Sequence, residues 1–404
     1  MSRSSVAKVD TKIKTLEKIR QAVKDRPAQL AALKKQGKKI VGWLNYFVPE
    51  EILLALDAVP VRIGVGGNEQ LVDIGGRYIS TKNCVFVRSV AGLLGEKKDP
   101  YTPLLDLLAV DASCLQIFRL AEVVKYYFKY ETLVLGVPRS FVSPEGKEYF
   151  RNELKDFTAA LEKFTGHKLE KTKLQASIEL LAGIREALQY LYQYQSQNYA
   201  NLNWREVFEI VHAGFYLDRA EYLKLLQELI AELKTLPEDK SRIPGIEPRV
   251  FLTGSQISPG DVKLIDIIED LGGKIIGDDL WTGLSAQLDI NITAPIVEAV
   301  ADGYLSRVPH AALPYLDIAT DSRIKKLKEL LHKFRAQAVI DHTLRYCDPY
   351  TFKAGETKDI LNNEGFPFLE IHTEYASSDI EAIRTRVEAF LELVRTRNDI
   401  AGGI

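Results

Sequence analysis

Short apolar runs alternate with helical periodicities in two separate stretches of this chain of 404 residues. Each run has the length of a strand, and segments typical of helices separate the runs. The predicted strands cover residues 39–43, 59–63, 107–110, 133–137, 249–254, 274–279, 338–340 and 367–371. Because strands that alternate with helices favour parallel sheets, we predict an α/β fold. We expect two doubly wound parallel-sheet lobes of the Rossmann or flavodoxin type, joined by a helical segment.

The helical segment lies between the two lobes. From residue 147 to 236 the strand signals disappear, and apolar residues such as Ile178, Leu181 and Ile184 recur at helical spacing. A stretch rich in proline and charge at 236–248 marks a boundary. Near the N-terminus, Pro27 interrupts a helical pattern and predicts a pair of amphipathic helices. The predicted domains are N-terminal helices at 1–36, a first lobe at 37–146, the helical segment at 147–245 and a second lobe at 246–404.

The composition is that of a globular protein, with 46% apolar residues, 27% charged residues and a formal net charge of −2. Basic residues are not gathered into a patch, so we do not expect nucleic-acid binding as the main role. No apolar run of about 18 residues occurs, and the N-terminus lacks the apolar core of a signal peptide. We therefore expect a cytoplasmic protein without a membrane segment.

Gly64, Gly66 and Gly67 directly follow the predicted strand at 59–63. Their spacing differs from the G-x-G-x-x-G fingerprint, and no helical pattern follows at once. We interpret them as a glycine-rich turn rather than as a dinucleotide site.

The chain has three cysteines. Because the number is odd and the expected compartment is reducing, we do not interpret them as a disulfide framework. Cys114 and Cys347 follow predicted strands of different lobes, and Cys84 precedes the apolar segment 85–87. Ligands of open parallel sheets bind beyond the carboxyl ends of the strands. A site that joins Cys114 to Cys347 would therefore lie between the two lobes.

Spacing alone leaves the role of the cysteines open. Structural zinc sites usually take their ligands from close pairs, which these three do not form. Thiolates suit an iron-sulfur cluster, and three thiolates on a four-iron cube leave one iron open to water or substrate. Free cysteines are also often inert buried side chains, which is the alternative.

Six segments carry a resemblance to a known family. They are GWLNYFVPEEI at 42–52, NCVFVRS at 83–89, Ser113-Cys114, LTGSQISPGDVKLIDIIEDLGGKIIGDDL at 252–280, RYCDPYTF at 345–352 and RTRVEAF at 384–390. With these segments the chain resembles the 2-hydroxyacyl-CoA dehydratase and benzoyl-CoA reductase family over nearly its whole length.

The resemblance implies a cofactor, partners and a reaction. In that family each cluster-bearing subunit holds a 4Fe-4S cluster through three cysteines, whose positions match Cys84, Cys114 and Cys347. Members act as paired homologous subunits, so a hetero- or homodimer is expected. A separate ATP-hydrolysing iron-sulfur activator injects one electron at low potential. The electron reaches an acyl-CoA thioester as a ketyl radical in the dehydratases and an aromatic ring in the reductases.

Several further residues are candidates for the site. Asn45 and Tyr46 follow the first predicted strand and can hydrogen-bond the thioester or the cluster, with loop capping as the alternative. Glu50 and Glu51 are candidate bases, although stabilisation of the start of a helix explains at least one of the two carboxylates. His342 precedes Cys347, and Arg345 beside it can bind CoA phosphates or form a loop ion pair.

The chain departs from the family at Leu115, because an aspartate often follows the second cysteine. The thiolate of Cys114 remains, so the departure affects the expected substrate rather than the cluster. Two alternative functions stay open. One is a homodimeric reductase of small molecules with a double-cubane cluster, which needs more cysteines than three unless the dimer shares them. The other is a subunit that only relays electrons.

Overall fold

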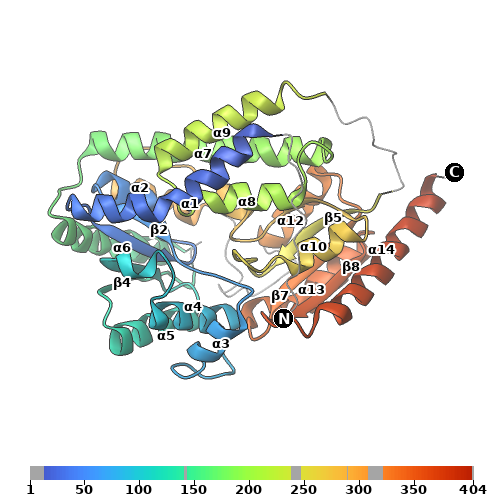
Figure 1. Ribbon diagram of the computed structural model, residues 1–404, viewed down its shortest axis with the longest axis horizontal. Helices are drawn as coiled ribbons and strands as arrows, with labels where there is room; N and C mark the ends of the chain where they lie inside the picture. Colours follow the sequence, from blue (N-terminus) through green and yellow to red (C-terminus); the bar gives the residue numbers. More distant parts are fainter. Residues whose placement is uncertain (1–12, 141–142, 238–246, 289, 308–321, 403–404) are drawn as a thin grey trace.

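A computed structural model describes residues 13–140, 143–237, 247–288, 290–307 and 322–402. It contains two four-stranded sheets, and all strand pairs within them are parallel. Figure 1 shows the two sheets in separate halves of the molecule, with long helices running across both.

The first sheet has the strand order β2-β1-β3-β4. Its strands are β1 (Ile40–Leu44), β2 (Val59–Arg62), β3 (Leu107–Asp111) and β4 (Thr132–Leu135). The other elements of this stretch are α2 (Glu50–Ala55), α3 (Glu69–Gly75), α4 (Val85–Glu96), the 3-10 turn η1 (Thr102–Leu104), α5 (Leu115–Val123) and the π-helical turn η2 (Val124–Phe128). The central strands β1 and β3 are buried along their whole length, as expected for a parallel sheet covered on both faces.

The second sheet has the order β6-β5-β7-β8 and so repeats the topology of the first. Its strands are β5 (Arg249–Gly254), β6 (Lys274–Asp278), β7 (Ala338–Leu344) and β8 (Phe368–Thr373). The other elements are α10 (Lys263–Asp270), the 3-10 turn η3 (Leu284–Gln287), α11 (Val297–Leu305), α12 (Ser322–Lys333), α13 (Asp348–Asn363) and α14 (Ile380–Gly402). The prediction of two doubly wound parallel-sheet lobes is confirmed.

The strand β7 continues past its predicted end at residue 340 and reaches Leu344. Asp341, His342 and Thr343 are polar, so the apolar run stops before them, yet all three are buried. β7 lies between β5 and β8, and pairing with both neighbours keeps these residues in the sheet. The predicted end of this strand is therefore wrong.

The stretch between the sheets is helical, as predicted. It contains α6 (Pro144–Thr165), α7 (Lys171–Gln197), α8 (Trp204–Ala213) and α9 (Arg219–Leu233). The long helix α7 contacts α2 of the first lobe and β6 of the second, so it connects the two lobes (Figure 1). The helix α11 packs on α6, and Val300 and Ala301 of α11 belong to the hydrophobic core of the first lobe.

The predicted pair of N-terminal helices is wrong, because α1 (Lys14–Lys35) is one helix with Pro27 inside it. A proline at this position cannot donate to the carbonyl of Val23. The hydroxyl of Tyr101 donates to that carbonyl oxygen instead, at 3.5 Å. Contacts of α1 with α8 and α9 also stabilise the helix across Pro27.

The predicted glycine-rich turn forms a contact between the lobes. The backbone N–H of Gly66 donates to the carbonyl of Pro259 at 2.8 Å. Gly67 has a φ of +65°, and a Cβ there would collide with the carbonyl oxygen of Gly260. Glycine is therefore required at this turn by both backbone conformation and the close approach of the second lobe.

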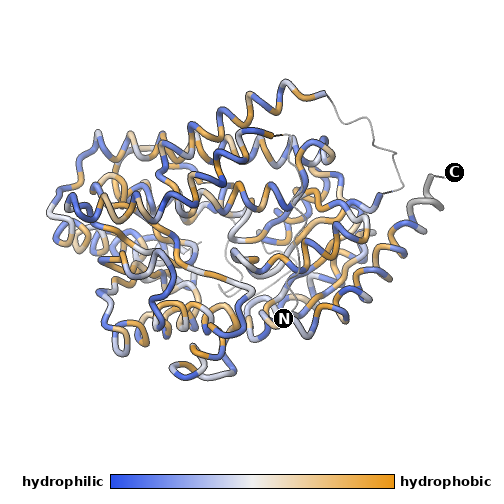
Figure 2. The backbone as a smooth tube through the Cα atoms, viewed as in Figure 1, coloured by the Kyte–Doolittle hydropathy of each residue, from blue (hydrophilic) through white to orange (hydrophobic). Residues whose placement is uncertain are grey.

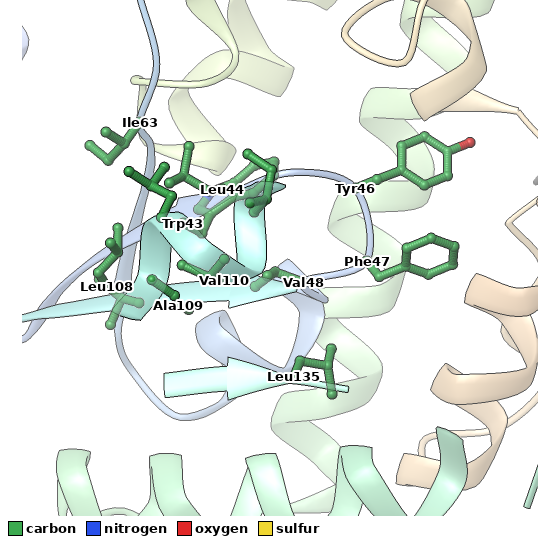
Figure 3. Close-up of a cluster of buried hydrophobic side chains, with 14 of the residues drawn as sticks. Trp43, Leu44, Tyr46, Phe47, Val48, Ile63, Leu108, Ala109, Val110 and Leu135 are labelled. Carbon is green, nitrogen blue, oxygen red and sulfur yellow. The ribbon is translucent and has the colours of Figure 1, made fainter. Parts of the chain in front are cut away.

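Figure 3 shows part of the first lobe's core, where side chains of β1 pack on those of β3. Beyond the end of β1, the rings of Tyr46 and Phe47 point away from this sheet. Figure 2 shows hydrophobic and hydrophilic residues alternating along α7 and α9, as expected for helices with one buried face. None of the described helices combines the length and apolar character that crossing a bilayer requires.

Candidate functional site

The three cysteines line one cavity at the seam between the lobes, which we name the cysteine cavity. It has about 440 Å³ of empty space, part of it open to solvent. Asn45 and Cys114 come from the loops after β1 and β3, and Gln256 and Cys347 come from the loops after β5 and β7. These are the positions where the strand order reverses in each sheet, which is where open α/β sheets bind ligands.

Each cysteine stands at the start of a helix. Cys84 precedes α4, Cys114 precedes α5 and Cys347 precedes α13. Backbone N–H groups from the first turn of each helix donate to the sulfur atoms, which favours the thiolate forms. Three helix N-termini thus direct their partial positive charge at one cavity.

The thiols interact with one another. The thiol of Cys347 donates a hydrogen bond to the sulfur of Cys84, which lowers the pKa of Cys84 and raises that of Cys347. The nearby guanidinium of Arg88 also lowers the pKa of Cys84. Burial raises the pKa of Cys114, and the charge of Cys84 adds to the effect. Cys84 is therefore the thiol that ionises most readily.

Among the described residues, no group of three or more His, Cys, Asp or Glu side chains is placed to hold a single metal ion. A four-iron cube binds each thiolate at a different iron, so its ligands stand farther apart than those of one ion. Apart from the cysteines, mostly apolar side chains such as Phe86, Ile117 and Leu344 line the cavity. This donor set fits a cluster held by three thiolates better than it fits a lone cation.

Gln116 connects the three loops that carry the cysteines. It follows Cys114 by two positions, and its side-chain oxygen accepts from the backbone N–H of Cys84 at 2.5 Å. Its side-chain nitrogen donates to the carbonyl of Tyr346, directly before Cys347, at 3.0 Å. No sequence pattern singles out Gln116, because both of these partners are far away in the chain.

Asp111, at the end of β3, organises the first lobe's side of the cavity. Its buried carboxylate accepts hydrogen bonds from Asn45, Tyr46, Phe47 and Ser113. This residue is not among the candidates predicted from the sequence. An acidic side chain at the end of an apolar strand, just before Ser113-Cys114, is the signal that could have found it.

A second, larger cavity adjoins the first. It has about 700 Å³ of empty space and shares Asn45 and Trp281 with the cysteine cavity. Aromatic side chains form much of its wall, and four arginines line it. We name it the arginine cavity; the arginines are Arg62, Arg185, Arg219 and Arg307.

Asn45 and Tyr46 both lie at this double site. Asn45 has a φ of +79° and donates from Nδ2 to Asp111 at 2.9 Å and to Ser113 at 2.5 Å. Its side-chain nitrogen is thereby fixed, while the residue lines both cavities. Tyr46 lines the arginine cavity, and its hydroxyl donates to the carbonyl of Ser285 at 3.3 Å.

Glu50 also lines the arginine cavity, where it forms an ion pair with Arg219. The Nε of Arg219 donates to Oε2 of Glu50 at 2.7 Å. Burial raises the pKa of Glu50 above its usual range, and the charge of Arg219 opposes that shift. Glu50, which the sequence predicts as a base, is therefore engaged in an ion pair with Arg219.

His342 is in the buried strand β7 and is not among the residues that line the two cavities. Its Nε2 lies 3.6 Å from Oδ2 of Asp261. Burial lowers the pKa of His342 to about 4 and raises that of Asp261 to about 7. His342 is therefore uncharged at neutral pH, and its contact with Asp261 is not an ion pair between two full charges.

Two other residues noted in the sequence, Arg345 and Leu115, lie at the surface. Arg345 forms an ion pair with Glu374 at 2.6 Å, which is the alternative role considered for it. Leu115 begins α5 directly after Cys114, and 55% of it is exposed. The departure from the family at this position therefore changes the surface beside the site rather than its interior.

Comparison with known proteins agrees with the sequence segments. The chain matches the family model described as 2-hydroxyglutaryl-CoA dehydratase, D-component, over residues 45–394. YjiM of Escherichia coli (strain K12), which carries a provisional name as a dehydratase subunit, is 25% identical over 366 residues, 90% of this chain and 93% of that protein. The (R)-phenyllactyl-CoA dehydratase beta subunit of Clostridium sporogenes is 22% identical over 363 residues, 89% and 93% of the two chains. One of the subunits of benzoyl-CoA reductase from Thauera aromatica is 23% identical over 361 residues, 89% and 91% of the two chains.

Proposed function

Because the chain belongs to the 2-hydroxyglutaryl-CoA dehydratase D-component family, we propose that it is an iron-sulfur subunit of an enzyme acting on a CoA thioester. The proposed reaction is the dehydration of a 2-hydroxyacyl-CoA or the reduction of an acyl- or aryl-CoA. The names of the relatives, which are dehydratase and reductase subunits, support an enzyme of this class.

The observation that carries the proposal is the meeting of Cys84, Cys114 and Cys347 in one cavity. The three residues are far apart in the sequence, and inert buried thiols have no reason to converge. Helix N-termini face all three sulfur atoms, which stabilises a group of negative charge. The three cysteines would hold a 4Fe-4S cluster, which supplies one-electron chemistry at low potential when bound.

The arginine cavity is the proposed site of the acyl group. Asn45 and Trp281 form the wall that it shares with the cysteine cavity, so a thioester at this wall lies beside the thiols. Asn45 is proposed to position the thioester by packing at this wall, because its two amide N–H groups are donated to Asp111 and Ser113 and hold the side chain in place. Tyr46 is proposed to form part of the wall around the acyl group, and Glu50 remains the proposed proton acceptor. A role for His342 can only be indirect, through the packing of β7.

The proposal includes two protein partners. The relatives are named as subunits, which supports a second homologous subunit, identical or different. An ATP-dependent iron-sulfur activator is proposed as the electron donor. Cys114 and Cys347 are partly exposed, so the cavity lies close enough to the surface for an electron to reach it from a docked protein.

The test is metal analysis of protein purified under strict anoxia. We expect about four iron and four sulfide per chain, with the electron paramagnetic resonance signal of a 4Fe-4S cluster after reduction. Single Cys84→Ala, Cys114→Ala and Cys347→Ala variants should lose most of the iron. Leu115→Asp is the control, since its exposed side chain lies beside Cys114, and it should keep the wild-type iron content.

Essentially no iron or sulfide in the anoxic protein would defeat the proposal. If the protein contains a cluster, turnover measurements distinguish a catalytic subunit from a subunit that only relays electrons. As part of an enzyme, the protein converts the thioester with its partner, activator and ATP, and it loses this activity in Asn45→Ala. A subunit that only relays electrons keeps its cluster but tolerates changes in the arginine cavity.

A further inference from the structure

The loop that carries Cys347 is exposed and contains a strained residue. Arg345, Tyr346 and Asp348 around the cysteine all lie at the surface, and 38% of Tyr346 is exposed. Tyr346 has a φ of +65°, a left-handed conformation that is unfavourable for an aromatic residue. Strained backbone of this kind persists only where surrounding contacts hold it. Contacts with other parts of the protein are therefore needed to fix the position of Cys347.

Gln116 of the first lobe supplies such a contact across the seam between the lobes. Its side-chain nitrogen donates at 3.0 Å to the carbonyl of Tyr346, the strained residue directly before Cys347. The same nitrogen lies 3.4 Å from a carboxylate oxygen of Asp348, directly after Cys347. The two N–H groups of one amide thus face both chain neighbours of the cysteine.

The oxygen of the same amide is engaged within the first lobe. It accepts from the backbone N–H of Cys84 at 2.5 Å, and Gln116 itself follows Cys114 in the first turn of α5. One planar amide therefore connects the backbone segments of all three cysteines. A second hydrogen bond across the seam runs from the backbone N–H of Val85 to the carbonyl of Arg345 and is longer, at 3.3 Å. It involves no side chain, so it remains available when Gln116 is replaced.

Loss of a hydrogen bond that orients a metal ligand typically lowers metal affinity about 10- to 100-fold. We infer that Gln116 is a positioning residue, whose amide holds Cys347 of the second lobe in place relative to Cys84 and Cys114 of the first. It thereby determines how firmly the proposed cluster is retained. The inference rests on the proposed function and adds to it a residue that is not itself a ligand and acts through the loops of the three cysteines.

The test is the rate of iron release from anoxically purified protein to an excess of the Fe(II) chelator bathophenanthroline, followed by the absorbance of the iron complex. Gln116→Met keeps the length of the side chain and removes its hydrogen bonds. We expect this variant to release iron at least about tenfold faster than the wild type. Its electron paramagnetic resonance signal after reduction should be broader, because the position of Cys347 is then less fixed.

Gln116→Glu assigns the effect to the N–H groups that cross the seam. A carboxylate still accepts from the backbone of Cys84, but it offers no donor to Tyr346 and it repels Asp348. Iron release should therefore be at least as fast as in Gln116→Met. The double variant Gln116→Glu with Asp348→Asn provides a donor from the second lobe and should release iron more slowly than Gln116→Glu alone. A defect in folding alone would not be rescued in this way.

Gln337→Met is the matched control. The side-chain oxygen of Gln337 also accepts from a distant backbone N–H, that of Arg249 at 2.9 Å. This contact lies at the start of β5 and β7, the edge of the second sheet opposite to the cysteine cavity. The control should release iron at the wild-type rate. Equal release rates for Gln116→Met and the wild type would overturn the inference, and so would a double variant that releases iron no more slowly than Gln116→Glu.

Hydrogen–deuterium exchange of protein stripped of iron separates this inference from the proposed function. Without the hydrogen bonds of Gln116, the backbone of residues 83–86 and 345–350 should take up deuterium faster in Gln116→Met than in the wild type. A wild-type protein that contains no iron or sulfide when purified under anoxia would defeat the proposed cluster but leave this comparison intact. Equal deuterium uptake in the two proteins would overturn the inference about Gln116, whatever the iron content.

Discussion

The carboxylate of Asp111 accepts a hydrogen bond from the side-chain amide of Asn45 at 2.9 Å, and both residues are buried. The backbone N–H groups of Tyr46 and Phe47 each donate to the other carboxylate oxygen at 2.6 Å. Ser113 donates to the first oxygen through its backbone at 3.0 Å. One side chain therefore holds the loop after β1 against the loop that carries Cys114.

The first prediction concerns this carboxylate. Asp111→Asn replaces one acceptor oxygen by an NH₂ group that faces backbone donors, so at least one buried hydrogen bond is lost. We expect the free energy of unfolding to fall by about 3 kcal/mol. Asp57→Asn is the control, because Asp57 forms an exposed ion pair with Lys38 and should cost at most about 1 kcal/mol. Urea unfolding followed by circular dichroism measures both, and equal losses would refute the organising role of Asp111.

The second prediction concerns the glycine contact between the lobes. Gly67→Ala places a Cβ against the carbonyl oxygen of Gly260 in a left-handed conformation, and relief requires the lobes to separate. We expect a loss of stability of at least about 3 kcal/mol. Gly37→Ala is the matched control, since Gly37 has a φ of +87° but no atom within 4 Å of the added carbon, and backbone strain alone costs about 1 kcal/mol. Similar thermal unfolding temperatures of the two variants would mean that the contact between Gly67 and Gly260 accommodates the added Cβ at little cost in stability.

The third prediction concerns the buried Glu51, which connects three helices. Its carboxylate accepts from Arg185 of α7 at 3.0 Å and from the hydroxyl of Tyr304 of α11 at 2.7 Å. Glu51 and Arg185 form a buried ion pair, and removal of one charge leaves the other uncompensated. Glu51→Gln and Arg185→Met should therefore each lower the free energy of unfolding by about 3 kcal/mol. The double variant should cost clearly less than the two single losses together.

A second double-mutant cycle is the control for this prediction. Arg151 and Asp302 form an ion pair between α6 and α11 in which both side chains are about 40% exposed. Its coupling energy should stay below about 1 kcal/mol because water screens exposed pairs. A coupling energy for Glu51 and Arg185 no larger than this value would contradict the burial argument.

The sequence was sufficient for the architecture because parallel strands buried on both faces are continuous apolar runs. The runs at 107–110 and 249–254 correspond to β3 and β5, and the acidic or polar residues after them mark the edge that holds the site. Cys114 and Cys347 could be selected in the same way, from their positions after strands, and all three cysteines could be selected from the family segments. Their meeting in one cavity is what the structure adds.

The errors and omissions share a physical cause, which is compensation by residues distant in the chain. Pro27 stays inside α1 because the hydroxyl of Tyr101 donates to the carbonyl that the proline leaves free. The polar end of β7 is held by two neighbouring strands. Arg62 and Arg307 of the arginine cavity could not be selected, since nothing in their local sequence distinguishes a buried arginine from an exposed one.

The last prediction concerns pH and the buried His212. This residue packs between Phe208 and Phe215, with ring centroids 3.9 Å and 5.2 Å away. Burial lowers its pKa to about 4 from an ordinary value of 6.5, and the charge of Arg62 adds to the shift. The unfolded chain therefore takes up a proton as the pH falls through 6.5, whereas the folded protein does so only near pH 4. The contribution of His212 to stability is thus present at neutral pH and is lost as the pH falls from 6.5 to 4.

A comparison with His212→Gln isolates this effect from the other titrating groups, because Gln is neutral and can still donate to a backbone carbonyl. At pH 7 the variant should be less stable than the wild type, since it packs less well against the two rings. Between pH 7 and pH 4.5 the stability difference should move in favour of the variant by about 2 kcal/mol. Urea unfolding at the two pH values measures this shift. A difference that does not change with pH would mean that His212 takes up its proton equally well in the folded and unfolded chains.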